Sequence, residues 1–108
     1  MQSLPKIINA TSYPDRTIEI EYSNGLKKVF NFQNFFEYIG YYDFLKDTDT
    51  FLKLNIDPHG HFVFWINEQT QEEIELDPQI MYSICSNEKI IHDHKVVFDP
   101  TLGKNGWS

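Results

Sequence analysis

The sequence has little from which several common kinds of protein site are built. It contains a single cysteine, Cys85, which excludes an intramolecular disulfide and a cysteine-built zinc site and is typical of a reducing compartment. Its longest apolar run is residues 62–66, far shorter than a membrane-spanning helix requires. The first residues have neither the charged start nor the apolar stretch of a signal peptide. We therefore expect a cytoplasmic protein without a membrane segment.

Basic residues are also scarce, nine against 16 acidic ones, which gives a net charge of −7. No lysine or arginine lies between residues 54 and 88, where the acidic residues are Asp57, Glu68, Glu72, Glu73, Glu75, Asp77 and Glu88. The nine acids elsewhere balance the nine bases, so the whole net charge belongs to this third of the chain. Such a field attracts a basic protein and argues against direct contact with nucleic acid. The alternative is that these carboxylates only keep the domain in solution.

Aromatic residues are plentiful: nine Phe, six Tyr and two Trp among 108 residues. A chain of this length is the size of one domain, and the aromatic side chains supply the buried area of its core. We predict a single small α+β domain whose antiparallel sheet has about five or six strands, with one or two short helices. Residues 1–87 are expected to form this domain and residues 88–108 an extension, within which residues 95–98 have the composition of an additional edge strand.

Alternating residues predict a hairpin near the amino terminus. Residues 17–22 place Ile18, Ile20 and Tyr22 on one face, and residues 26–32 return after a turn signal at residues 23–25. A two-residue loop would pair Glu19 with Phe30, whereas a three-residue loop pairs Ile18 with Phe30. We favour the three-residue loop, with Gly25 in the left-handed region.

The rest of the sequence predicts further strands, turns and one helix. A helix is expected to begin at Pro78 with Asp77 as its cap and an apolar face that includes Cys85. Trp65 belongs to an apolar central strand and is expected in the core. The other expected elements are a strand at 6–13, a helical turn at 34–44 ended by Gly40, strands at 51–56, 61–66 and 73–76, and a type I turn at 57–60.

These patterns resemble the bacterial domain-of-unknown-function 2442 family over residues 4–83. The resemblance depends on core and turn residues distributed along the chain, so it concerns the fold more than an activity. The matching segments are Ile18-x-Ile20-x-Tyr22-x-Asn24-Gly25, Val29-Phe30-Asn31-Phe32, Leu45-x-Asp47-x-x-x-Phe51, Asp57-x-x-Gly60 leading to Trp65, and Ile74-x-Leu76-x-Pro78-x-x-Met81-Tyr82.

The resemblance implies a small α+β domain with no agreed catalytic residues. Members of the family are often encoded beside another small domain, an arrangement interpreted as a toxin–antitoxin pair. This chain departs from the family pattern at residues 67–72, which lengthen the span before the last strand, and at residues 88–108, which extend beyond it. We expect the individual properties of this protein, including its partner, to depend on these two segments.

Four histidines fall into two His-x-His pairs, His59 with His61 and His92 with His94. In a strand this spacing points two imidazoles to one side, as a divalent metal requires. No third ligand has a spacing that would close either site, and the first pair falls in a predicted turn. The pairs are therefore weak metal candidates, and we predict no cofactor.

Nucleophilic catalysis would need Cys85 with His92 or His94, or the nearby Ser83 or Ser86. Because Cys85 lies on the apolar face of the predicted helix, it is more typical of a small buried hydrophobe than of a nucleophile. No nucleophile elbow or other local signature accompanies these residues. We therefore predict that the protein is not an enzyme.

The leading hypothesis is a small acidic, antitoxin-like binding module that covers a basic active or nucleic-acid surface on a protein partner. The predicted partner-binding residues are Glu68, Glu72, Glu73, Glu75, Asp77 and Trp107. The alternatives are a phage-encoded inhibitor of a host nuclease, such as an anti-CRISPR protein, and a small metal-binding protein or enzyme that uses the histidine pairs. In the first two cases the partner is a basic protein, a toxin or a nuclease, and neither nucleic acid nor a membrane is bound directly.

Overall fold

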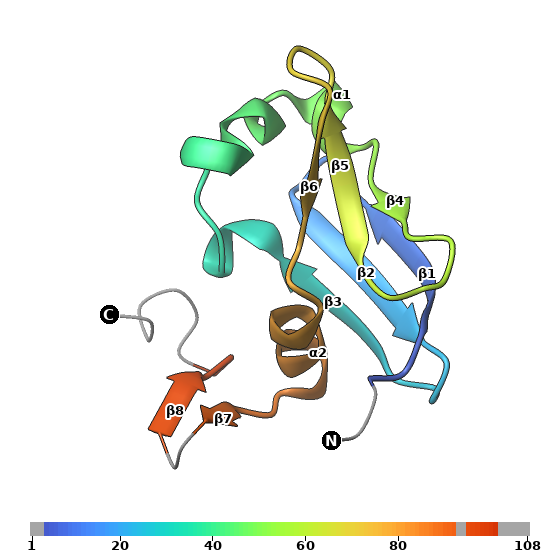
Figure 1. Ribbon diagram of the computed structural model, residues 1–108, viewed down its shortest axis with the longest axis vertical. Coiled ribbons are helices and arrows are strands. Elements are labelled where there is room, and N and C mark those ends of the chain that lie inside the picture. The colour runs from blue at the N-terminus through green and yellow to red at the C-terminus, as the bar shows by residue number, and fades with distance from the viewer. Residues whose placement is uncertain (1–3, 93–94, 102–108) are drawn as a thin grey trace.

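The protein is a single small α+β domain, as predicted. A computed structural model describes residues 4–92 and 95–101, and Figure 1 shows their arrangement. The elements are β1 (Ile7–Ser12), β2 (Thr17–Tyr22), β3 (Lys27–Asn31), the 3₁₀ helices η1 (Phe32–Asn34) and η2 (Gly40–Lys46), α1 (Thr48–Phe51), β4 (Asn55–Ile56), β5 (Val63–Asn67), β6 (Glu72–Glu75), α2 (Pro78–Ser86), β7 (Ile90–His92) and β8 (Lys95–Phe98). Instead of one sheet, the described strands form three antiparallel ones, ordered β1-β2-β3, β4-β5-β6 and β7-β8.

The first sheet has the predicted register. Ile18 lies opposite Phe30 and Glu21 opposite Lys27, and the amide of Tyr22 donates to the carbonyl of Leu26 over 2.8 Å. Gly25 has a φ of 89°, a backbone conformation that glycine adopts without steric cost. The three-residue loop is therefore confirmed.

The first and second sheets meet at the turn of residues 57–60. Gly60 donates its amide to the carbonyl of Asp57 over 2.8 Å, and its own carbonyl accepts from the amide of Ile7 over 2.7 Å. Its φ is 72°, and a Cβ atom there would lie 2.8 Å from the carbonyl oxygen of Ile7. Only glycine allows the two backbones to approach this closely. The predicted turn is confirmed, and it also joins β1 to the second sheet.

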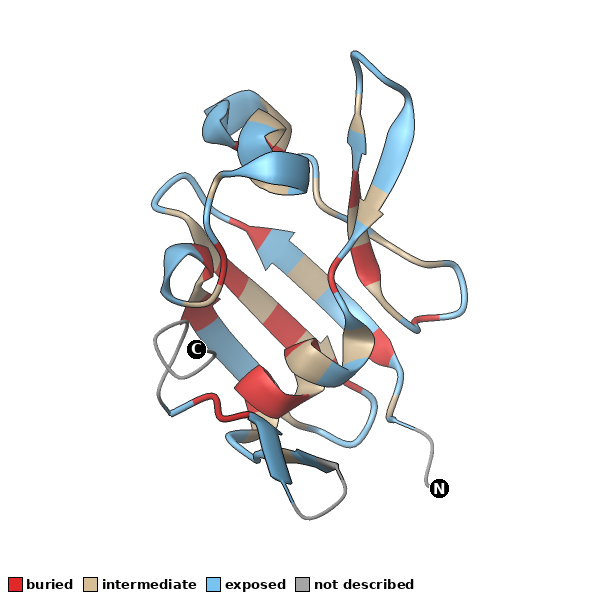
Figure 2. Ribbon diagram, turned by 60° about the vertical axis from the view of Figure 1, so that its left-hand side comes forward, coloured by how far each residue is buried: buried red, intermediate tan, exposed pale blue. Residues whose placement is uncertain are grey.

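The core is aromatic and centres on Phe32, whose ring lies 5.7 Å from those of both Phe51 and Trp65. Figure 2 shows buried residues alternating with partly buried ones along the middle strand of the first sheet. The carbonyl of Phe51 accepts two buried side-chain hydrogen bonds, from Trp65 Nε1 at 2.9 Å and from Ser12 Oγ at 2.8 Å. These bonds tie α1 to both three-stranded sheets, and they confirm Trp65 as a core residue.

The segment between the two three-stranded sheets differs from the prediction. Gly40 begins η2 instead of ending a helical turn, and Phe51 ends α1 instead of beginning a strand. Asp47 causes the second difference because its carboxylate caps α1, accepting from the amide of Thr50 at 3.0 Å and from its hydroxyl at 2.8 Å. Of the strand predicted at 51–56, only β4 forms. The alternation of apolar and polar residues at 51–56 favours a strand, but the cap at Asp47 starts a helix that includes Phe51.

Helix α2 begins as predicted. The carboxylate of Asp77 accepts from the amides of Gln79 and Ile80 at 2.8 and 3.0 Å, with Pro78 as the first helical residue. The helix buries Met81, Ile84 and Cys85, among others. None of the helices in the described ranges is long and apolar enough to cross a membrane.

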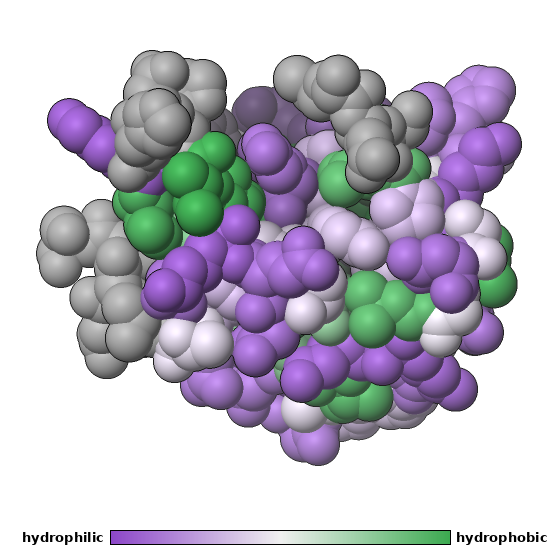
Figure 3. All heavy atoms as spheres, turned by 90° about the horizontal axis from the view of Figure 1, so that it is seen from below, coloured by the Kyte–Doolittle hydropathy of each residue, from purple (hydrophilic) through white to green (hydrophobic). Residues whose placement is uncertain are grey.

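Strand β8 occurs where the composition predicted it, but its partner is β7, not an edge of either three-stranded sheet. Phe98 is buried, and its ring lies 6.3 Å from that of Phe35. Ile91, Val96 and Val97 remain exposed on this small hairpin. Figure 3 shows apolar surface within the polar face seen from this end of the molecule.

Candidate partner-binding site

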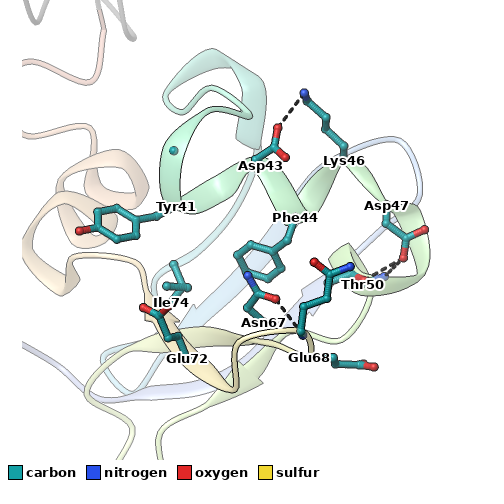
Figure 4. A pocket seen from close by; sticks show the side chains of 12 residues that line it. Tyr41, Asp43, Phe44, Lys46, Asp47, Thr50, Asn67, Glu68, Glu72 and Ile74 are labelled. Carbon is teal, nitrogen blue, oxygen red and sulfur yellow. Dashed lines mark hydrogen bonds and ion pairs between the residues drawn. The ribbon is translucent and has the colours of Figure 1, made fainter.

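A groove of about 660 Å³ separates η2 from the β5–β6 hairpin. In Figure 4, Phe44 points from η2 toward this hairpin, while Asp43 and Lys46 stay on the rim. Tyr41 points away along the same helix and is 75% exposed. The groove is lined by Gly40, Tyr41, Asp43, Phe44, Lys46, Asp47, Thr50, Asn67, Glu68, Gln69, Glu72 and Ile74.

Each wall of the groove is fixed by local hydrogen bonds. On one side Asp47 ends η2 and caps α1. On the other side Asn67 organises the loop between β5 and β6, since its side chain accepts from the amide of Gln69 at 3.0 Å and its carbonyl from the amide of Gln71 at 2.7 Å. Gln71 has a φ of 64°. The lengthened segment 67–72 therefore has a defined structure that borders the groove.

The groove is acidic. Its lining includes four carboxylates, on Asp43, Asp47, Glu68 and Glu72, and one ammonium group, on Lys46. Lys46 lies 2.8 Å from Asp43, and Lys53, which does not line the groove, lies 2.6 Å from Glu68.

Three of these carboxylates, on Asp43, Asp47 and Glu68, are already engaged within the chain. Hydrogen bonds from Thr50 hold the pKa of Asp47 below its usual value, and the hydrogen bond to Glu68 raises the pKa of Lys53. Both ion pairs lie at exposed positions, where such pairs contribute little to stability. Glu72 has no basic partner among the described residues.

The predicted contact residues do not form one cluster. Glu68 and Glu72 line the groove, whereas Glu73 and Glu75 point to the opposite face of β6, because side chains alternate along a strand. Asp77 caps α2 and already accepts two hydrogen bonds. Trp107 lies outside the described residues. Glu73 and Glu75 are therefore exposed together on one face of β6, whereas Asp77 is occupied within the fold.

The sequence prediction missed the other wall. Asp43, Phe44 and Asp47 line the groove, precede residues 54–88 in the chain and are not among the predicted contact residues. Asp43 lies in the 3₁₀ helix η2 and Asp47 is the extended residue between η2 and α1, so helical spacing does not place them on one face. Their position opposite Glu72 depends on how η2 packs, which no local pattern specifies.

The first histidine pair lies in the exposed turn after Asp57. The rings of His59 and His61 stack with centroids 5.8 Å apart, and His61 Nδ1 lies 3.8 Å from a carboxylate oxygen of Asp57. Over residues 4–92 and 95–101, no three side chains of the metal-binding types come together. His92 ends β7, and His94 lies outside the described ranges.

Cys85 is buried in α2 beneath the first sheet. Burial raises the pKa of its thiol to about 12, the opposite of what activates a cysteine nucleophile. The neighbouring Ser83 donates its hydroxyl to the carbonyl of Glu88. Cys85 therefore packs in the core, and Ser83 satisfies a carbonyl group just beyond the end of α2.

Neither a family model nor a curated protein matches the chain. A solved structure of a protein of unknown function from Rhodospirillum rubrum is similar, with a TM-score of 0.50 and 18% sequence identity. The similarity covers 77% of this chain and 92% of that one. At this identity the likeness concerns the fold alone, and it agrees with a small α+β domain.

Proposed function

We propose that this protein is a small acidic, non-enzymatic binding module, antitoxin-like, that covers a basic active or nucleic-acid surface of a protein partner. The observation that supports this most is the position of the unbalanced charge. Glu72 is exposed on one face of β6, and Glu73 and Glu75 are exposed on the other. No described base lies within ion-pair distance of any of them.

These carboxylates have no evident role inside the fold. Same-face residues of a strand lie roughly 6.6 Å apart, so Glu73 and Glu75 repel each other weakly in water. A partner that presents lysine or arginine side chains would relieve this repulsion and would associate faster because of the field. The antitoxin-like role in particular is the expectation that the resemblance to the 2442 family implies, and no family model matches the chain.

The proposal is tested by capturing partners from the native host with tagged protein and then measuring binding of the purified partner. We expect a basic partner whose affinity falls as salt rises. Glu72→Lys with Glu75→Lys should slow association at least about tenfold and flatten the salt dependence. Glu21→Lys with Glu88→Lys makes the same change of total charge away from the groove and serves as the control.

Two results would contradict the proposal. One is a partner with no basic surface. The other is an association rate and salt slope that are the same for the wild type and for the Glu72→Lys, Glu75→Lys variant. An equal effect of the two double variants would mean that only total charge matters, and the site assignment would then be wrong.

A further inference from the structure

Strand β6 is an edge strand that borders the groove. In the second sheet it pairs only with β5, and Glu72 and Ile74 face η2 across the groove. Figure 1 shows β6 at the outside of this sheet, on the side of η2. In the described part of the chain no other strand pairs with its outer side.

The hydrogen-bond pattern shows which backbone groups point outward. The amide of Leu76 donates to the carbonyl of Val63 over 3.0 Å, so these residues form a hydrogen-bonded pair. In an antiparallel ladder such pairs alternate with pairs that do not exchange hydrogen bonds. Ile74 opposite Trp65 is therefore hydrogen-bonded, whereas Glu73 and Glu75 direct their N–H and C=O groups away from β5.

We propose that an extended basic segment of the partner adds to this edge as a fourth strand, pairing its backbone with Glu73 and Glu75. This proposal rests on the proposed function and specifies how the partner binds. Strand addition supplies affinity through main-chain hydrogen bonds and specificity through alternate side chains. Strand β6, with four residues, offers a pairing length of roughly 13 Å.

The charges on both faces of β6 indicate which kind of segment would pair with its open edge. Side chains of an added strand alternate between the face of Glu72, with Asp43 and Glu68 nearby in the groove, and the face of Glu73 and Glu75. Lysine or arginine on either face would thus lie opposite carboxylates. Cross-strand pairs of opposite charge are favourable, while like charges directly opposite are unfavourable.

The same charges argue against a second copy of this chain pairing through its own β6, since glutamates would then oppose glutamates. Another candidate within this protein is the basic edge strand β3 of a second copy. Its Lys27, however, lies 3.1 Å from Glu19 of the same hairpin. A basic segment from another protein has no such internal partner, and it is the occupant that we propose.

The test uses two synthetic peptides of about nine residues, long enough to cover β6. Both alternate lysine with threonine, and in one of them alternate backbone amides are methylated. Methylation keeps the charge but removes the hydrogen bonds of strand addition. Binding to the full chain is measured at low salt, and amide exchange is followed by nuclear magnetic resonance.

We expect the unmethylated peptide to bind at least about fivefold more tightly and to slow exchange of the Glu73 and Glu75 amides. Glu73→Pro removes an outward donor together with the carboxylate and spares the ladder with β5, so it should weaken the unmethylated peptide more than Glu73→Gln does. Glu73→Gln with Glu75→Gln should weaken both peptides, whereas the control Glu21→Gln with Glu88→Gln should change neither.

Equal binding of the two peptides without protection at Glu73 and Glu75 would overturn strand addition and leave the proposed function intact. If neither peptide binds at low salt, addition of a basic strand to β6 fails, and the proposed function is then decided by the measurements with the purified partner. Protection of these amides that rises with protein concentration in the absence of peptide would mean that a second copy occupies the edge, and this would also overturn the inference.

Discussion

The hairpins β2–β3 and β5–β6 have the same antiparallel geometry but handle charge differently. In the first hairpin each acidic position has a base near it: Glu21 lies opposite Lys27, whose Nζ lies 3.1 Å from Glu19. The hydrogen bond from Lys27 lowers the pKa of Glu19, and the bond to Glu19 raises the pKa of Lys27. These charges are balanced within the hairpin.

In the second hairpin the residues opposite the glutamates carry no charge. Glu75 pairs with Phe64, Glu73 with Ile66 and Glu72 with Asn67. Trp65 is the one fully buried aromatic residue of β5 and β6, and it anchors this hairpin in the core. The comparison shows that folding accounts for the charges of the first hairpin but not for those of the second.

Removing the anchor of the second hairpin should have the largest effect. Trp65→Ala deletes a fully buried side chain and its hydrogen bond to the carbonyl of Phe51. We expect it to lower the free energy of unfolding by about 3–5 kcal/mol. Trp65→Phe keeps most of the ring contacts and should cost less. Denaturant unfolding measures both, and equal stability of Trp65→Ala and wild type would contradict the assignment of Trp65 to the core.

Alkaline pH should have the next largest effect on stability, through buried groups at the inner face of the first hairpin. Tyr22 packs beside Cys85, and burial raises the pKa of the Tyr22 phenol as well as that of the Cys85 thiol, which reaches about 12. Because the folded pKa of Cys85 lies above its unfolded value of 9.0, its contribution is complete below about pH 9 and is lost as pH rises toward about 12. Cys85→Ala should show a shallower decline of unfolding free energy above about pH 9, and an identical decline would refute this.

Much of the fold follows from local patterns. The loop at Gly25, the turn at Gly60 and the cap at Asp77 each depend on residues close together in sequence, and all three occur as predicted. The segment around Phe51 was predicted wrongly, because alternation over six residues suits a strand while the cap at Asp47 starts a helix.

The groove was less predictable than the fold. Glu68 and Glu72 were identified from the absence of bases in their third of the chain, which is a property of the sequence. Asp43 and Asp47 reach the groove through the packing of η2. Because their positions depend on contacts between distant segments, the sequence indicated one wall and not the other.

Reversing a charge in the balanced hairpin should have a small, measurable effect on stability. Lys27→Glu replaces the pair with Glu19 and places like charges opposite each other at Glu21. We expect a loss of about 0.5–1 kcal/mol in the free energy of unfolding, and a smaller loss at high salt. Lys27→Met, which removes the charge without adding another, should lie between this variant and the wild type.

Reversing charges in the unbalanced hairpin should affect stability least. Glu73→Lys with Glu75→Lys breaks no ion pair among the described residues, and the long side chains remain exposed on the same face of β6. The opposite residues, Ile66 and Phe64, contact an aliphatic lysine stem as readily as a glutamate stem. We expect the unfolding free energy to stay within about 0.5 kcal/mol of the wild type. Denaturant unfolding beside Lys27→Glu decides the comparison: a loss above about 1 kcal/mol would mean that the fold itself uses these carboxylates, and the case for a partner at this edge would then be lost.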